Sequence, residues 1–245
     1  MSTPIEHARA YPFAVPSHSY VLDANGWHEL DHDFETEDRH AVIASGSNAS
    51  PDRLAAKFET LDAPVYVTQA VLKDFDAVYS AHITSYGSIP ATLAHAPGVE
   101  ADVFVTWLTD DQLARMHETE ALGQNYNYVR LDGIELRLNS GEMLDRAHAY
   151  ISNWGCLNRG EKPIALKELT AQNRIWTAMS QTEVLDYVQS LFKSDANADD
   201  FVQKHIDCEV TRKGRIVRLS ISALDYGWPE ENSEQIAPPP EEPSE

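Results

Sequence analysis

The chain has 245 residues, of which 42% are hydrophobic, and a formal net charge of -20 from 39 acidic and 19 basic residues. This length and composition can bury a full core, so a wholly disordered chain is excluded. The acidic balance disfavours nucleic acid and anionic membranes as partners, because binding phosphates needs a basic surface.

Neither the cysteines nor the N-terminal residues indicate export. The two cysteines, Cys156 and Cys208, form no Cys-x-x-Cys pair and are too few for a disulfide framework. Residues 1–7 lack the basic and apolar regions of a signal peptide, and no apolar stretch approaches membrane-spanning length. We therefore expect a cytoplasmic protein with no membrane partner.

The N-terminal residues 1–38 are predicted to form an irregular acidic segment. Residues 23–38 contain seven acidic side chains and no Lys or Arg. Within them, His28-Glu29-Leu30-Asp31-His32 matches a zinc-metalloprotease pattern, which needs a helix with both histidines on one face. The polar surroundings favour a solvated loop, so we predict no metal site here.

The next segment is a strand followed by a turn and a helix. An apolar strand over residues 42–44 runs into Ser45-Gly46-Ser47-Asn48, and a helix over 51–58 begins with Ser50 as N-cap and Pro51 in the first turn. Such a turn leaves several backbone N–H groups pointing at one spot, which suits a carboxylate or a phosphate. The alternative is an ordinary strand–turn–helix connection.

Alternating apolar, β-branched and turn residues predict a strand-rich region after this helix. The expected strands are 65–72, 75–83, 89–94, 99–108, 126–131, 134–138 and 147–151. Pro97-Gly98 indicates a turn, and Asp132-Gly133 a two-residue hairpin. Many strands with only two clear helices favour an α+β fold with a closed or strongly curved sheet.

A second helix is predicted from the capping box Thr109-Asp110-Asp111-Gln112. Met116 and Glu120 follow at helical spacing, which places the Glu120 carboxylate on or near the buried face. A buried carboxylate is costly unless it is paired or used chemically. The alternatives for Glu120 are a solvated helix end and an ion pair with Arg115 or Arg130.

The pattern becomes helical after Trp154, and residues 157–228 are predicted to be a helical extension packed on the first domain. The expected helices are 163–169, 173–179, 182–192 and 198–206, followed by a hairpin of 208–211 and 215–223 around Lys213-Gly214. This extension is a candidate surface for a homodimer or a protein partner. Residues 229–245 contain six Glu and no basic residue, and are predicted to be a disordered acidic tail.

Four blocks of the sequence carry a resemblance to a known family through their order and spacing. They are Val42-Ile43-Ala44-Ser45-Gly46-Ser47-Asn48, Ile89-Pro90-Ala91-Thr92-Leu93 with Pro97-Gly98, residues 108–120, and Tyr128-Val129-Arg130. Together they resemble the gamma-glutamylcyclotransferase-like family over about residues 40–152. The resemblance implies a small mixed β-barrel with flanking helices, which we expect over residues 39–156.

The resemblance also implies a reaction. The turn would hold the carboxylate of a γ-glutamyl group, and Glu120 would act as general base, so that a γ-glutamyl amine or peptide cyclises to 5-oxoproline. It implies an acyltransferase or lyase with no metal or organic cofactor. The implied substrate contacts are Ser45, Gly46, Ser47, Asn48, Tyr126 and Tyr128, with cross-strand packing as the alternative for at least one of the two tyrosines.

The chain departs from the family pattern at several positions. Ser45 stands where the family has a tyrosine, Met116-His117 replaces Leu-Asp, and Val103 and Ala121 replace glycines. Two other functions therefore stay open. One is a non-catalytic module on the same fold that binds small carboxylates or another protein, and the other is an amide hydrolase that uses the same pocket.

Overall fold

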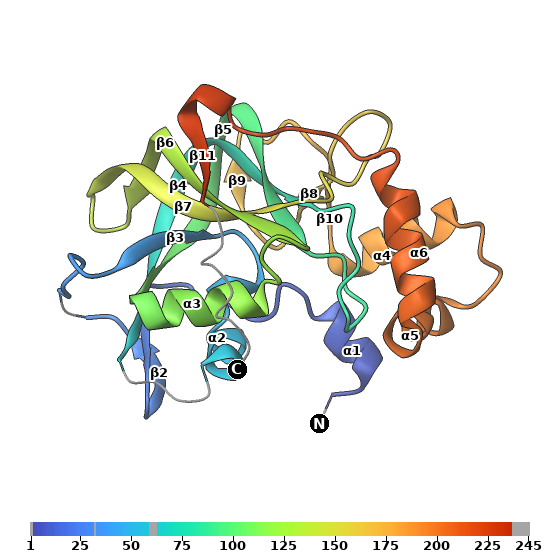
Figure 1. The fold of residues 1–245 in the computed structure, drawn as a ribbon, viewed down its shortest axis with the longest axis horizontal. Coiled ribbons are helices and arrows are strands. Elements are labelled where there is room, and N and C mark those ends of the chain that lie inside the picture. Colours follow the sequence, from blue (N-terminus) through green and yellow to red (C-terminus); the bar gives the residue numbers. More distant parts are fainter. Residues whose placement is uncertain (1, 32, 59–62, 237–245) are drawn as a thin grey trace, which may run out of the picture.

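The structure, a computed structural model, describes residues 2–31, 33–58 and 63–236. Five of its strands are β3 (His40–Ala44), β4 (Val65–Tyr79), β5 (Ala91–Leu108), β6 (Tyr126–Leu138) and β7 (Met143–Ser152). β4 pairs with β5, β5 with β3, β3 with β7, β7 with β6, and β6 with β4 again. This ring is closed, and its β3–β7 pair is parallel (Figure 1). The predicted α+β class, with a small mixed β-barrel, is confirmed.

The barrel interior is filled by apolar side chains from alternate strand positions. On β5, Ala101, Val103, Val105 and Trp107 are each at most 5% exposed and belong to one core cluster. Leu131 on β6 packs into the same cluster. Successive side chains of a strand point to opposite faces, so apolar residues at every second position all face the interior of the barrel. The barrel is therefore filled by a packed apolar core.

Six helices surround the barrel in the described residues. They are α1 (Pro4–Arg9), α2 (Pro51–Lys57), α3 (Asp110–Thr119), α4 (Gln181–Leu191), α5 (Ala198–Asp207) and α6 (Glu209–Ser220). Figure 1 shows α2 and α3 below the barrel, α4, α5 and α6 together at one side, and α1 between the two groups. Among the described residues, no helix is both long and apolar enough to cross a membrane.

The helix starts at α2 and α3 agree with the sequence. Ser50 is the N-cap residue of α2 and Pro51 lies in its first turn, but the buried Ser50 hydroxyl makes no capping hydrogen bond. Both hydrogen bonds of the predicted capping box are present in α3, where Thr109 N–H donates to Gln112 Oε1 at 3.0 Å and Gln112 N–H donates to Thr109 Oγ1 at 3.3 Å. These two helices therefore begin where local chemistry directs them.

Two predicted turns and one predicted gap between strands are bulges inside long strands, so the predicted breaks at these positions are wrong. β4 shifts register between Lys73 and Phe75, with Asp74 at a φ of 63°. β5 runs through Gly98, and β6 runs through Gly133 with a register shift that replaces the predicted hairpin. A bulge inserts a residue and bends the strand without ending it, which a barrel needs to curve.

The N-terminal segment is not irregular, contrary to the prediction. After α1 it forms a hairpin of β1 (Tyr20–Asp23) and β2 (Gly26–Glu29), and β1 pairs with β4. His28 lies exposed on β2, so the helix that a metalloprotease pattern requires is absent there; His32 lies outside the described residues. Burial of Tyr20 against the barrel explains why this polar segment folds.

The C-terminal region also differs from its prediction. The expected helices over 163–169 and 173–179 are wrong, because these residues form loops with the short strands β8 (Ala165–Leu166), β9 (Ala171–Gln172) and β10 (Ala178–Met179). Their backbone groups pair with open edges of the sheet. The helices expected over 182–192 and 198–206 are present as α4 and α5.

The predicted hairpin around Lys213-Gly214 is wrong as well. The region is the helix α6, which buries Ile216 and Leu219. Gly214 lies inside this helix and misled the prediction, because a glycine lowers helix stability without preventing a helix that buries an apolar face.

Part of the predicted disordered tail is ordered. A 3-10 turn, η2 (Glu230–Asn232), leads into β11 (Ser233–Ile236), which pairs antiparallel with β6. Arg130 on β6 forms an ion pair with Glu234 on β11 at 2.7 Å. Residues 237–245 lie outside the described residues.

Candidate active site

A cavity of about 510 Å³ lies where the turn after β3, the end of α3 and the first part of α6 meet. Most of the residues that the sequence selected line it. They are Ser45, Gly46, Ser47, Asn48, Glu120 and Tyr126. The volume falls in the range of small-molecule sites.

The turn after β3 brings backbone close to a neighbouring side chain. Ser47–Ala49 form a 3-10 turn, η1, that follows Gly46. A Cβ at position 46 would overlap the hydroxyl of Tyr11 and lie 3.3 Å from the Cβ of Ala91. Only glycine fits this close approach.

The Glu120 carboxylate is the C-cap residue of α3 and faces the turn. Asn48 Nδ2 donates to Glu120 Oε1 at 3.2 Å. Lys57, at the end of α2, forms an ion pair with the same oxygen and also donates to Asn48 Oδ1 at 2.7 Å. The exposed fractions of the Lys57 and Glu120 side chains are 9% and 13%, so the pair is largely desolvated.

Glu120 is neither a solvated helix end nor paired with Arg115 or Arg130, which were the alternatives expected from the sequence. Arg115 pairs with Glu118, and Arg130 pairs with Asp132 and Glu234. The partner is Lys57, which sequence reasoning missed. Its signal is a lysine three residues after the buried Leu54, on the apolar face of α2.

The two oxygens of Glu120 have different roles in this arrangement. The hydrogen bonds from Asn48 and Lys57 both fall on Oε1. No group among the described residues donates to Oε2. Oε2 is therefore the oxygen that these two donors leave unoccupied.

Tyr11, from the N-terminal segment, is a further residue of the site that sequence reasoning missed. Its side chain lines the cavity, is 4% exposed, and accepts a hydrogen bond from Ala91 N–H at 2.7 Å. Burial raises the pKa of the Tyr11 hydroxyl, and the Glu120 charge acts in the same direction. The hydroxyl therefore stays protonated and keeps its own proton to donate.

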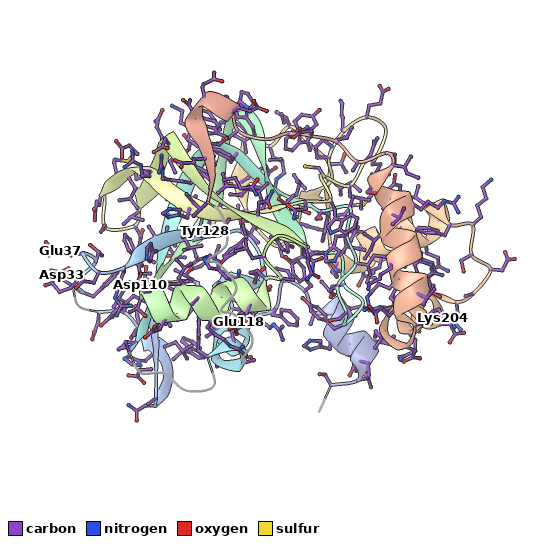
Figure 2. The ribbon with its side chains drawn as sticks, viewed as in Figure 1. Asp33, Glu37, Asp110, Glu118, Tyr128 and Lys204 are labelled. Atoms are coloured by element: carbon purple, nitrogen blue, oxygen red, sulfur yellow. The ribbon has the colours of Figure 1, made fainter. Side chains whose placement is uncertain are left out.

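The two tyrosines predicted from β6 lie in different places. Tyr126 lines the cavity, and its hydroxyl donates to the Ala91 carbonyl at 3.2 Å. Tyr128 lies outside the cavity, on the barrel side of α3 (Figure 2), stacked on His148 with ring centroids 4.8 Å apart. It faces Tyr150 across the β6–β7 pair, which is the packing alternative for this residue.

The rest of the cavity wall carries more cations than carboxylates among the described residues. Arg53, Lys57, Arg212 and Lys213 line it, against Glu120 and Glu209. In a chain with about twice as many acidic as basic residues, this reversal gives the cavity wall a local excess of positive charge.

No family model and no curated protein matches the chain. The solved structures that are similar to it include the following three. One, named gamma-glutamyl cyclotransferase, is 14% identical over 69% of this chain and 87% of its own, with a TM-score of 0.39. An uncharacterised protein from Homo sapiens is 14% identical over 80% of this chain and 96% of its own, with a TM-score of 0.40. An Arabidopsis thaliana protein is 16% identical over 71% of this chain and 95% of its own, with a TM-score of 0.38.

Proposed function

We propose that this protein is an enzyme that cyclises a γ-glutamyl amide to 5-oxoproline, with Glu120 as the general base. One observation carries the proposal. The Glu120 carboxylate and the Ser45-to-Asn48 turn, far apart in sequence, line one cavity and touch through a 3.2 Å hydrogen bond. The sequence resemblance to the gamma-glutamylcyclotransferase-like family supports the same reaction.

The γ-glutamyl group would bind with its α-carboxylate at the turn. Gly46 and Ser47 line this end of the cavity, together with Tyr11, whose hydroxyl lies near the backbone of Ser47 and Ala91. The Tyr126 hydroxyl donates to the Ala91 carbonyl, and the Ala91 N–H donates to the Tyr11 hydroxyl. The Tyr11 hydroxyl is therefore held in position before the substrate binds. Fixed donors stabilise an anion without reorganising when it binds.

The reaction moves two protons from the α-nitrogen of the substrate to the leaving amine. Glu120 Oε2 takes the first proton from the α-ammonium group, and the freed amine attacks the γ-carbonyl carbon. The new C–N bond closes the five-membered ring. Glu120 returns this proton to the leaving nitrogen as the C–N bond to it breaks, and the second proton passes from the ring nitrogen through the same carboxylate to the released amine. The products are 5-oxoproline and the amine in its ammonium form, and the enzyme is unchanged.

Positioning supplies much of the rate in this scheme. The attacking amine and the carbonyl belong to one molecule, so the enzyme has only to hold the chain in a folded conformation. No described residue has to act as a nucleophile. The base has only to be ionised and within reach of the amine.

A second candidate function is favoured by the ion pair itself. A buried lysine engages Oε1 of Glu120, and the Tyr11 hydroxyl lies against Gly46 of the turn. Both features suit a non-catalytic module that binds small carboxylates. Turnover separates this candidate from the enzyme.

Replacement of Glu120 by glutamine tests the proposal. The wild type is expected to release 5-oxoproline from γ-glutamyl amides, and Glu120→Gln to lose about 100-fold or more of kcat, because a general base contributes roughly 10²–10⁴-fold. Glu118→Gln is the matched control. It changes an exposed glutamate on the same helix, paired with Arg115 outside the cavity, and should keep the wild-type rate.

Three results would contradict the proposal. Full activity of Glu120→Gln would remove its role as base. Tight binding of small carboxylates with no turnover across a γ-glutamyl panel would favour the non-catalytic module. Linear glutamate as the product, in place of 5-oxoproline, would show that water is the nucleophile.

A further inference from the structure

The helix α6 presents a row of apolar side chains to solvent. Seven large hydrophobic side chains are exposed in the described residues, and three of them, Val210, Val217 and Ile221, lie on α6 or at its C-cap. Val210 and Ile221 are the two most exposed, at 82% and 81%. With Gly214, these residues recur at helical spacing, which places all four on one face of the helix. We call this face the α6 stripe.

No helix or strand within residues 2–31, 33–58 and 63–236 covers the α6 stripe. The helix packs inward through Ile216 and Leu219 on its other side. A Cβ built on Gly214 meets nothing within 4 Å, so the middle of the stripe is open to the close approach of another backbone. Figure 1 shows α6 at the front of the C-terminal helices, with nothing drawn over it. Single exposed apolar residues are ordinary, whereas a contiguous row of them marks an interaction surface.

The charge of α6 is opposite to that of the whole chain. The helix has four basic residues and one acidic residue, whereas the chain has 19 basic and 39 acidic residues. Lys213 and Arg218 are exposed and flank the stripe on its two sides. The stripe is therefore an apolar strip with positive borders. Such a basic amphipathic helix is typical of a surface that binds an acidic partner.

The size and charge of the stripe select its occupant. Residues 210–221 span about 17 Å of helix, which suits one crossing helix and is less than a stable dimer needs. A second copy of the chain would bring two basic helices together, and an anionic membrane would meet a chain with a net charge of -20. A partner helix with an apolar face and acidic flanks complements both the apolar row and its borders.

We propose that the α6 stripe is a docking surface for an acidic amphipathic helix of a partner protein. The apolar face of that helix packs on Val210, Val217 and Ile221, and its carboxylates meet the two flanking cations. The stripe adjoins the candidate active site, because Lys213 and Val217 also line the cavity. A docked helix therefore covers one rim of the cavity. This proposal is independent of the proposed function, since it depends only on the exposed side of α6.

Two synthetic peptides of opposite charge test the surface. Each is a helix of about 18 residues with leucine along one face, long enough to span the stripe. One peptide carries glutamate on its other faces, and the second carries lysine at the same positions. Fluorescence anisotropy of the labelled peptides is expected to show about tenfold or tighter binding of the acidic peptide, because complementary charge favours one and opposes the other. Added salt should weaken this preference.

Variants of the stripe locate the bound peptide. Val210→Ser and Ile221→Ser, which change residues outside the cavity lining, should each lower the affinity for the acidic peptide by about tenfold, as for a lost buried aliphatic contact. Arg218→Gln should lower it by up to about fivefold, as for an exposed ion pair. Ile175→Ser is the matched control, because Ile175 is 55% exposed and lies between β9 and β10. It should bind as the wild type does, and circular dichroism reports folding of each variant.

Other results would overturn the proposal. The acidic peptide could fail to bind at about 1 mM, both peptides could bind equally, or Val210→Ser and Ile221→Ser could leave binding unchanged, and each outcome would show that the stripe is not an acidic-helix surface. Dimerisation of the wild type in sedimentation analysis that is lost in Val210→Ser would identify a second copy as the occupant. Binding to vesicles of equal parts phosphatidylglycerol and phosphatidylcholine that the same variant loses would identify a membrane instead.

Discussion

At the scale of single residues, Lys57 and Tyr11 are the side chains that contact the two predicted parts of the site, the Glu120 carboxylate and the Ser45-to-Asn48 turn. Lys57 forms an ion pair with Glu120 and fixes Oε1, and Tyr11 places a neutral hydroxyl beside Gly46. Ser45 lines the cavity without the bulk that a tyrosine would bring at that position. A phenol is nevertheless present in the cavity, because the N-terminal segment places Tyr11 beside Gly46.

Replacement of Gly46 by alanine is expected to destabilise the protein by about 1–3 kcal/mol, as for overpacking of a filled site. The new Cβ overlaps the Tyr11 hydroxyl, so the tyrosine has to leave the Ala91 amide. Urea unfolding measures the change in the free energy of unfolding.

A double-mutant cycle identifies the cause. Tyr11→Phe alone should cost about 1–3 kcal/mol, because it leaves the buried Ala91 N–H unpaired. Gly46→Ala should cost clearly less when made in the Tyr11→Phe background, since the clashing oxygen is gone. Equal costs in both backgrounds would show that the clash with Tyr11 is not what requires glycine.

Several site residues could be predicted from the sequence because their signals are local. Glu120 follows a capping box at helical spacing, and the Ser45-to-Asn48 turn joins an apolar strand to a helix. Tyr11 and Lys57 carry no such signal. Tyr11 lies in a segment that reads as irregular, and its contact with Ala91 spans 80 residues, so only the closed fold reveals it.

At the scale of elements, the same glycines and turn residues that suggested chain reversals mark bulges. Gly98 and Gly133 have φ angles of 83° and 69°, which are typical of a turn and also of a bulge. Local sequence does not distinguish the two, because the difference lies in whether the flanking residues find partners on neighbouring strands. The barrel supplies these partners, and β4, β5 and β6 continue through their irregularities.

Gly214 inside α6 offers a clean test of the element that replaced the predicted hairpin. Nothing lies within 4 Å of a Cβ built at this position. Gly214→Ala is therefore expected to stabilise the protein by about 0.5–1 kcal/mol through helix propensity. A thermal melt should show a rise in Tm of roughly 2–4 °C per kcal/mol for a chain of this size.

Gly98→Ala is the matched control. A Cβ at position 98 also meets nothing within 4 Å, but its φ of 83° is unfavourable for alanine. This variant should lower Tm. A lower Tm for Gly214→Ala would contradict the helical assignment of Lys213-Gly214, because alanine would then replace a glycine that a turn requires.

At the scale of the whole molecule, the C-terminal helices bury polar groups that depend on pH. His205 on α5 is fully buried against Phe201, with ring centroids 4.7 Å apart, and neither of its ring nitrogens has a hydrogen-bond partner. Burial, together with Arg215 and Arg212, lowers the pKa of His205 to about 3. His82, at the cavity, has a pKa lowered to about 4 by burial. Both histidines are neutral in the folded protein and take up protons on unfolding in mild acid.

The sign of the resulting pH dependence follows from these directions. Above about pH 6.5 both states hold the histidines neutral, and their titration does not affect stability. As pH falls below 6.5 the unfolded state binds the protons first, so the free energy of unfolding falls. Each histidine contributes a slope of up to about 1.4 kcal/mol per pH unit, until the folded pKa near 4 or 3 is reached.

His205→Leu isolates one of these contributions. Leucine has no group to protonate, and the histidine it replaces makes no hydrogen bond through its ring in the described structure. We expect the variant to lose less stability than the wild type between pH 6.5 and 4, as measured by urea unfolding at a series of pH values. His28→Gln, an exposed histidine on β2, should follow the wild-type curve. If His205→Leu follows that curve as well, the buried imidazole is not a source of the acid sensitivity, and protonation of paired carboxylates accounts for it instead.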